Sequence, residues 1–493
     1  TSIPTKSVLL VGHMINFKPI SFVIGLTLSK LALFMWLPLV IAFSSGTAGT
    51  AEFLASAVLT HVAALVFTRA GYQQAFRLSV RDMFVLTTLV WLIACAFAAL
   101  PFLFLSKLSF TDAYFEAMSG ITTTGSTVLR GLDHLPPAIL HWRSLLQWLG
   151  GIGFIILAVA VLPYLNVGGM KLFQMESSDR TEKDSPRISA VARNILGAYI
   201  GLTILCCVSY WLSNMSLFDA INHAMTTLSS GGFSTHDASM GAFSVKAQWV
   251  ACLFMFLSGL PFMLYVQSIR RREGLLFRDA QVRGFFWLVV IISLLMTGWL
   301  WYRNVFGLED ALRIAFFNVV SILTTTGFGL TDFSTWSSMT TILFVFLMLL
   351  GACSGSTSGG LKIFRIQIAA ALFQKQTRQL MHPAGVFPQK YNGRPVNDAI
   401  VRSIVAFVLS YLAVIICSAT LLGLMEIPPL DAISGAMTAV SNVGLGMGQL
   451  INTSGNYAAI PDPAKWILAA DMLLGRLEIL TIVVLLFPSF WKD

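Results

Sequence analysis

The sequence predicts an all-α membrane protein with many transmembrane helices, and three observations support this fold class. Of the 493 residues, 56% are hydrophobic and 11% are charged, whereas soluble proteins carry about 25% charged residues. The mean hydropathy is +0.77. Four segments also share one pattern of aspartate, short apolar stretch and glycine-rich loop. The chain is therefore expected to repeat one membrane-embedded unit four times.

Ten apolar stretches predict ten transmembrane helices, since a helix needs about 20 apolar residues to cross a bilayer. Only the eighth stretch reads as interrupted. The stretches cover residues 19–43, 52–68, 83–105, 144–164, 190–212, 247–267, 284–302, 339–350 with 361–373, 400–424 and 464–488.

The positions of Lys and Arg predict the orientation. Of the 32 Lys and Arg residues, 23 lie in alternate loops and near the C-terminus, seven lie in the opposite loops and two lie inside spans. An excess of positive charge marks cytoplasmic loops. Both termini are therefore expected in the cytoplasm and the glycine-rich loops on the outer half. This distribution indicates orientation rather than nucleic-acid binding.

The four repeated segments lie between consecutive predicted spans, at residues 110–127, 217–235, 308–330 and 429–447. Each begins with Asp-Ala and ends in small polar residues and glycine. The Asp-to-Gly separation is 13 residues in three copies and 17 in the third, and the difference of four is about one helical turn. We therefore expect half-helices of about 8–14 residues, which are too short to span a bilayer. Two additional helices in 1–80 should precede four units, at 81–165, 166–268, 269–385 and 386–493.

The chemistry of these segments suits an ion pathway. The aspartates are expected to cap each half-helix at its positive end, so that its carbonyl end faces the loop. Rings of oxygen dipoles can replace the hydration shell of a cation, and glycine permits the positive φ angles that aim successive carbonyls alike. Ordinary turn chemistry is the alternative, and four copies on one side argue against it. The candidate cation-binding residues, here called the glycine segments, are Thr123, Thr124, Gly125, Ser230, Gly231, Gly232, Thr325, Thr326, Gly327, Asn442, Val443 and Gly444.

The interruption in the eighth stretch is rich in glycine and serine, which hold a helix poorly. It is either a simple kink or a flexible loop that blocks the pore beneath the glycine segments. It lacks the Gly-Lys order of a phosphate-binding loop. The candidate gate residues are Gly351, Ala352, Cys353, Ser354, Gly355, Ser356, Thr357, Ser358, Gly359 and Gly360.

Arg476 lies within the last apolar stretch. A charged residue at a helix centre costs at least about 2.5–3.5 kcal/mol, so it must face a cavity or pair with an acid. Two interpretations stay open: an ion pair with another helix, or a positive barrier to cations just below the glycine segments.

The sequence resembles the Trk/Ktr/HKT superfamily of potassium transporters, of the bacterial TrkH type, over nearly its whole length. The motifs that carry the resemblance are "TTTGST", "SSGGFST", "TTTGFGL", "SNVGLG", "GACSGSTSGGLKIFR" (351–365) and "MLLGRLEIL" (472–480). It implies four pseudo-symmetric units around one pore, with the matched glycines in the selectivity filter. Gly125, where Na⁺-favouring plant relatives tend to carry serine, implies a preference for K⁺.

The resemblance also implies the partners. A cytoplasmic ring of TrkA-type subunits would carry the regulatory nucleotide, ATP/ADP or NAD, so that this chain needs no cofactor of its own. A homodimer in the bacterial cytoplasmic (inner) membrane is implied as well, with Na⁺, Rb⁺ and Cs⁺ as further ions that the pore could admit.

The competing class is a secondary potassium transporter coupled to H⁺ or Na⁺. Transporter sites often use inverted repeats and acidic residues at the midplane, whereas these repeats share one orientation and acids within the spans are few. An enzyme is not expected, since the apolar regions hold no nucleophile–base pair or metal-ligand cluster.

Overall fold

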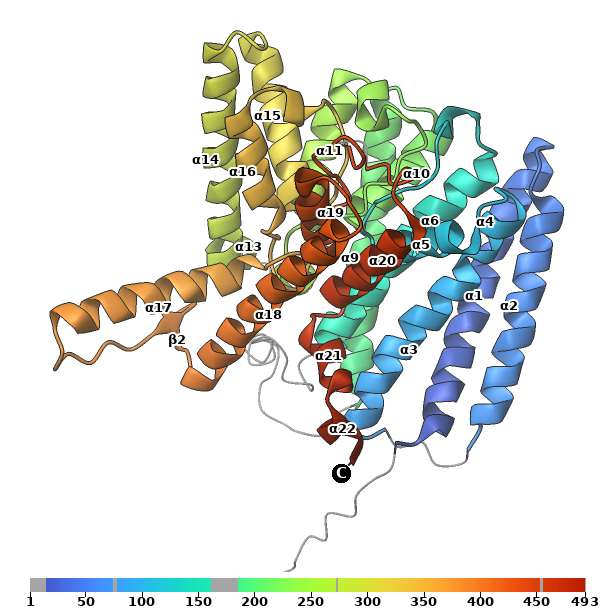
Figure 1. The fold of residues 1–493 in the computed structure, drawn as a ribbon, viewed down its shortest axis with the longest axis horizontal. Coiled ribbons are helices and arrows are strands. Elements are labelled where there is room, and N and C mark those ends of the chain that lie inside the picture. The colour runs from blue at the N-terminus through green and yellow to red at the C-terminus, as the bar shows by residue number, and fades with distance from the viewer. Residues whose placement is uncertain (1–14, 74–77, 161–184, 272–273, 453–454, 493) are drawn as a thin grey trace, which may run out of the picture.

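The computed structural model describes residues 15–73, 78–160, 185–271, 274–452 and 455–492, and these are mostly helical (Figure 1). In this part of the chain, six helices are long and apolar enough to cross a membrane, or seven if one bent helix pair is counted as a span. The protein is therefore a helical membrane protein, while the full set of ten spans stays a prediction.

The first two helices form an antiparallel hairpin at one edge of the molecule, drawn in blue in Figure 1. Helix α1 covers Phe17–Ser45 and α2 covers Thr50–Gly71. Their backbones approach closely, because a Cβ atom on Gly71 would lie 2.3 Å from the backbone nitrogen of Phe22. Helix α3 (Val80–Ala98) packs against α1 and continues after a turn as α4 (Leu100–Phe104).

Four short helices contain the repeated segments. They are α5 (Phe110–Ile121), α10 (Leu217–Leu228), α15 (Leu308–Leu323) and α19 (Pro429–Ser441), with 12, 12, 16 and 13 residues. The expected upper length of 14 residues is wrong for α15, which has the additional turn that the Asp-to-Gly spacing indicated.

Each short helix stands between two others. The preceding helices are α3–α4, α9 (Ser185–Leu212), α14 (Ala280–Tyr302) and α18 (Asp398–Gly423). The following helices are α6 (Pro137–Ala160), α11 (Val245–Ser258), α16 (Ser338–Met348) and α20 (Asp462–Arg476). Short 3₁₀ turns lie in three of the intervening loops: η1 (Leu132–His134), η2 (Ser239–Ala242) and η3 (Phe333–Thr335).

The remaining elements are short, except for α17. Helix α17 (Ile363–Met381) projects from the body together with a two-stranded antiparallel hairpin, β1 (Lys390–Tyr391) and β2 (Arg394–Pro395) (Figure 1). Helices α12 (Phe262–Arg271) and α13 (Leu275–Arg278) precede α14. The described chain ends with α21 (Leu480–Val483), η4 (Val484–Leu486) and α22 (Pro488–Lys492).

The expected capping role of the repeated aspartates is wrong in detail. In α5 the N-cap is Ser109, whose hydroxyl accepts a hydrogen bond from the Asp112 backbone N–H at 3.1 Å; α10 begins in the same way. Asp112 therefore stands in the first turn, where it still suits the positive end of the helix dipole. In α19, Asp431 instead accepts bonds from the backbone N–H groups of Leu450 and Ile451, at 2.9 and 2.7 Å. That aspartate holds the loop after its glycine segment.

Two apolar stretches that the sequence suggested as uninterrupted spans are broken. Stretch 247–267 bends by 87° between α11 and α12, where Gly259 packs against Ala352. Stretch 464–488 breaks after α20, because Glu478 and Ile479 have φ angles of 62° and 28°. Arg476 is thus the last residue of α20 rather than the middle of a continuous helix.

Candidate functional site

The four glycine segments have the same backbone conformation. Two residues before each matched glycine, a non-glycine residue has a φ angle between 53° and 56°, in the left-handed region. These residues are Thr123, Ser230, Thr325 and Asn442. The glycines themselves have φ angles of 90°, 75°, 74° and 91°. Left-handed backbone is uncommon for non-glycine residues, so its recurrence at four matched positions marks one shared structure.

The backbone N–H groups of the segments bond back to the helices in one pattern. The Thr123 N–H donates to Gly120 O at 3.0 Å, and the Thr124 N–H donates to Ser119 O at 2.9 Å. The other three segments repeat these bonds with the same residue spacings: Ser230 to Thr227 and Gly231 to Thr226, Thr325 to Ile322 and Thr326 to Ser321, and Asn442 to Ala439 and Val443 to Thr438. Because the donors are used in this way, the segments present mainly carbonyl oxygens to one another.

The four segments contact one another in a closed cycle. A Cβ atom built on each matched glycine would collide with the carbonyl oxygen of the residue before the matched glycine in the next segment. The four contacts are Gly125 to Gly231 O at 2.3 Å, Gly232 to Thr326 O at 2.0 Å, Gly327 to Val443 O at 1.9 Å, and Gly444 to Thr124 O at 2.3 Å. The contacts run from the first segment to the fourth and back to the first. All twelve predicted residues therefore lie together.

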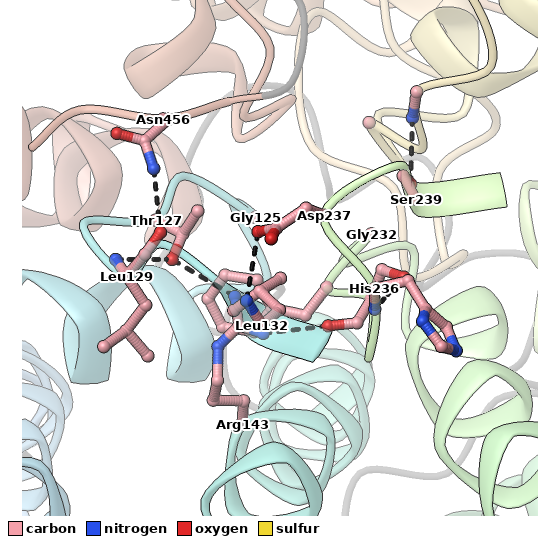
Figure 2. Close-up of a pocket in the computed structure, with 14 residues that line it drawn as sticks. Gly125, Thr127, Leu129, Leu132, Arg143, Gly232, His236, Asp237, Ser239 and Asn456 are labelled. Atoms are coloured by element: carbon pink, nitrogen blue, oxygen red, sulfur yellow. Dashed lines mark hydrogen bonds between the residues drawn. The ribbon is translucent and has the colours of Figure 1, made fainter. Parts of the chain in front are cut away.

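A cavity of about 50 Å³ opens above three of these glycines, Gly125, Gly232 and Gly327 (Figure 2). Its wall includes the hydroxyl of Thr127 and the amide of Asn456, whose side chain donates to Leu129 O at 2.8 Å. A site that holds one water needs only about 10–15 Å³ of such volume, so the cavity has room for several waters or a partly hydrated ion.

A buried ion pair supports this cavity from behind. Arg143 on α6 bonds Glu116 on α5 at 2.8 Å, and both side chains are at most 1% exposed. The guanidinium also donates to Ser234 O at 2.9 Å and to the Thr127 hydroxyl at 3.2 Å, as Figure 2 shows in part. Arg143 thereby ties the loop after the first glycine segment to the loop after the second. Arg143 is one of the seven basic residues that the charge pattern assigns to the outer loops, whereas in the structure it is buried within α6.

One residue that lines the cavity, His236, pairs with a carboxylate outside it. The ring of His236 hydrogen-bonds Asp133 in η1. This hydrogen bond lowers the pKa of the Asp133 carboxyl below its ordinary value. Asp133 therefore stays ionised to a more acidic pH than an ordinary aspartate.

The glycine- and serine-rich loop lies on the opposite side of the cycle. No helix covers residues 349–362, between α16 and α17, and the ten predicted residues 351–360 all fall within this gap. The loop contacts the left-handed residue of three glycine segments. The Thr357 hydroxyl bonds that of Ser230 at 2.8 Å, and the Gly359 N–H donates to the Thr325 hydroxyl at 2.6 Å. A Cβ atom on Gly359 would also lie 3.0 Å from Cβ of Asn442.

Arg476 contacts this loop rather than an acid. Its guanidinium donates to Thr357 O at 2.8 Å and to Gly150 O at 3.5 Å, and it lies 4.1 Å from the ring centroid of Phe154. Among the described residues, no carboxylate oxygen lies within 4.0 Å of the Arg476 guanidinium nitrogens, the distance that defines a salt bridge. The ion-pair alternative for this residue is therefore wrong for the part of the chain that the structure describes. Arg476 is 1% exposed and adjoins the loop.

Two further buried cations lie close to the loop. The Lys362 ammonium donates to Ser358 O and lies 5.4 Å from the same Phe154 ring. Arg365 pairs with Glu478 at 2.5 Å, with both side chains at most 4% exposed. Arg476 and Lys362 thus hold consecutive carbonyls of the loop, and both lie close to the same aromatic ring.

Sequence reasoning missed several of these side chains. Lys362 is one of the 23 basic residues that the charge pattern assigns to the cytoplasmic side, although its position just after the glycine-rich run is a signal that could have identified it. Glu116 and Arg143 are ionisable residues beside apolar stretches, which is itself a reason to suspect function in a membrane protein. Gln147 and Tyr457, which bond two of the segment carbonyls at 2.6 and 3.2 Å, gave no signal in the sequence.

Comparisons with known proteins agree with this picture. The family model described as "TrkH: Cation transport protein" matches residues 45–492. The chain is 42% identical over 481 residues to the Trk system potassium uptake protein TrkI of Halomonas elongata, which covers 97% of this chain and 98% of that protein. It is 38% identical over 424 residues to the Trk system potassium uptake protein TrkH of Escherichia coli, covering 84% and 86% of the two chains.

A solved structure is also similar. The crystal structure of the potassium transporter TrkH from Vibrio parahaemolyticus matches with a TM-score of 0.90 and 33% sequence identity, over 97% of this chain and 100% of that chain. These matches confirm the resemblance seen in the motifs, and they are to transport proteins, not enzymes. From its glycine segments to its overall fold, the chain belongs to the TrkH family of cation transport proteins.

Proposed function

We propose that the protein conducts K⁺ into a bacterial cell through a single pore in which the four glycine segments form the selectivity filter. The observation that carries the proposal is the closed cycle of glycine-to-carbonyl contacts. Stacked carbonyl oxygens from four segments provide the neutral rings that replace the hydration shell of K⁺. Named relatives that are potassium uptake proteins support the choice of ion.

The architecture proposed with this function has ten transmembrane helices. The first two, within 1–80, flank four units at 81–165, 166–268, 269–385 and 386–493 that surround the pore. Each unit contributes a helix, a short half-helix, a glycine segment and a second helix. The protein is proposed to lie in the inner membrane with both termini in the cytoplasm. In this orientation the cavity faces the non-cytoplasmic side of that membrane.

The loop 351–360 is proposed as the gate and Arg476 as a positive barrier beneath the filter. The loop contacts three of the four glycine segments, and Arg476 has no paired acid among the described residues. In a narrow pore with low-dielectric walls, such a charge strongly opposes cations. A cytoplasmic TrkA-type ring that binds a nucleotide is proposed to relieve this block, and the protein is proposed to act as a homodimer.

The filter is tested by Gly125→Ser. The Cβ atom would meet Gly231 O at 2.3 Å, so one quarter of the oxygen ring is displaced. We expect the Na⁺/K⁺ flux ratio in proteoliposomes to rise as total K⁺ flux falls. Gly131→Ser is the control, because Gly131 has a similar positive φ of 66° but open space around it. An unchanged ratio in folded Gly125→Ser protein would remove this residue from the filter.

The gate is tested by shortening residues 352–359 in the same preparation. We expect K⁺ flux without the regulatory partner to increase, since the segment blocks the pathway. Repeating the measurement with an imposed H⁺ or Na⁺ gradient distinguishes a pore from a coupled transporter. Flux at or below the wild-type level in folded protein, or strict dependence on the second ion, would contradict a gated pore.

A further inference from the structure

The second glycine segment lacks a side chain at a position where the other three have one. It carries Gly231 where the others carry Thr124, Thr326 and Val443. Gly231 lies outside the left-handed region, so its backbone conformation does not require glycine. The space does: a Cβ atom on Gly231 would lie 2.3 Å from Cδ and 2.4 Å from Oε1 of Gln147. The Gln147 side chain, which comes from α6, fills the place that a side chain has in the other segments.

Gln147 holds this segment at two points. Its side-chain N–H donates to Gly231 O at 2.6 Å, and its side-chain oxygen accepts a bond from the Phe233 backbone N–H at 3.0 Å. The side chain is completely buried. One amide therefore bonds the backbone on both sides of Gly232, the matched glycine of this segment.

The bond to Gly231 O makes one carbonyl of its ring unlike the others. Within the described residues, the matched oxygens Thr124 O, Thr326 O and Val443 O accept no hydrogen bond. Gly231 O shares its electron density with an N–H at 2.6 Å, which weakens the field that it can offer an ion. The field strength of coordinating carbonyls is one determinant of selection between K⁺ and Na⁺, with a stronger field favouring the smaller ion.

We infer that Gln147 is a specificity-determining residue, which restrains and weakens one filter carbonyl and thereby favours K⁺ over Na⁺. The inference rests on the proposed role of the glycine segments as ion ligands. Gln147 does not touch the ion; it acts through Gly231. Its role predicts a change in the ratio of two ion fluxes, whereas a side chain that only fills space would change stability or total flux alone.

The first test is Gln147→Met, which keeps the approximate volume and removes both hydrogen bonds. We expect the Na⁺/K⁺ flux ratio in proteoliposomes to rise about two- to fivefold, because the effect is a fraction of one hydrogen bond's free energy. Gln248→Met is the matched control. Gln248 is a buried glutamine on α11 that donates to Met240 O and Phe243 O at 3.2 and 3.1 Å, and its replacement should leave the ratio unchanged.

The second test uses the steric relation between the two residues. Gly231→Ala alone should lower the melting temperature by several degrees, because its Cβ atom collides with Gln147. Adding Gln147→Ala should restore much of that loss. The double variant has a side chain at position 231, as the other segments do, and lacks the amide. It should therefore show the raised Na⁺/K⁺ ratio even if Gln147→Met fails to fold.

The outcomes separate this inference from the proposed filter. A raised ratio in either Gln147 variant, with Gln248→Met unchanged, supports the inference. An unchanged ratio in folded Gln147 variants, with a changed ratio in Gly125→Ser, overturns the role of Gln147 and leaves the filter standing. An unchanged ratio in Gly125→Ser as well overturns both. No recovery of stability in the double variant would contradict the steric relation.

Discussion

The glycine segments and the loop 351–360 touch each other, yet they are built in opposite ways. The segments come from four places in the chain, share one backbone conformation and use neutral carbonyl oxygens. The loop comes from one place, lies beneath three of the segments and is held by Arg476 and Lys362. On the proposed function, four matched segments are needed to surround an ion evenly with oxygen atoms, whereas a barrier needs only one segment and a few charges.

The largest expected effect comes from a substitution within the glycine segments. Gly327→Ala places a Cβ atom 1.9 Å from Val443 O and should abolish K⁺ flux in proteoliposomes and reduce folded yield. Gly131→Ala is the matched control: its φ of 66° gives a comparable backbone penalty of about 1–2 kcal/mol, but nothing lies within 4 Å. If both variants lose flux equally, backbone strain and not the carbonyl contact is responsible.

The role of the positive charges near the loop 351–360 is tested by comparing two buried arginines. Arg365→Met leaves Glu478 unpaired, and breaking a buried pair typically costs about 3–5 kcal/mol, so its melting temperature should fall sharply. Arg476→Met leaves no acid unpaired among the described residues and loses bonds to Thr357 O and Gly150 O. It should stay nearly as stable and raise K⁺ flux.

Flux and melting temperature should be measured on both arginine variants in the same preparation. A destabilised Arg476→Met protein with unchanged or lower flux would contradict the barrier. It would instead make this arginine a structural residue of the same kind as Arg365.

The sequence predicts the glycine segments and Arg476, but not all of the contacts that hold them. The twelve positions of the glycine segments were predicted because four imperfect copies could be aligned, and Arg476 because a charge stands out in an apolar stretch. The break at Glu478 and Ile479 was not predicted, since neither residue is a glycine or proline. Gln147 could not be found, because an uncharged residue that acts on Gly231, 84 positions later, forms no local pattern.

A third prediction concerns Lys362, the other cation that contacts the loop 351–360. Lys362→Met removes the cation that holds Ser358 O, next to the carbonyl held by Arg476. We expect a smaller increase in K⁺ flux than in Arg476→Met, because Arg476 still holds the loop. The double variant should exceed both single variants. Equal flux in Lys362→Met and wild type would assign this lysine to packing against Phe154 alone.

The smallest expected effect concerns the carbonyl oxygen of Gly444, one of the four matched glycines. The Tyr457 hydroxyl donates to Gly444 O at 3.2 Å, and the Ser126 hydroxyl lies 3.4 Å from the same oxygen. Tyr457→Phe should raise the Na⁺/K⁺ flux ratio by less than about twofold, since Ser126 keeps a bond and one hydrogen bond is worth about 1 kcal/mol.

The control for this variant is Tyr210→Phe, which changes a buried tyrosine whose hydroxyl bonds Thr227 and, within the described residues, no carbonyl of the glycine segments. A larger shift in Tyr210→Phe than in Tyr457→Phe would show that the loss of any buried hydroxyl changes the ratio. The Gly444 oxygen would then have no special part in it.

The closed cycle of contacts has a consequence for how such a protein can change over generations. In an assembly of four identical chains, one altered codon replaces the same atom four times at once. Here each glycine and the carbonyl beside it are encoded separately, so a single codon change alters one quadrant and spares three. On the proposed function, ion preference can therefore change one quadrant at a time, and Gly231, whose side-chain space Gln147 of α6 occupies, is the position at which one quadrant already differs from the other three.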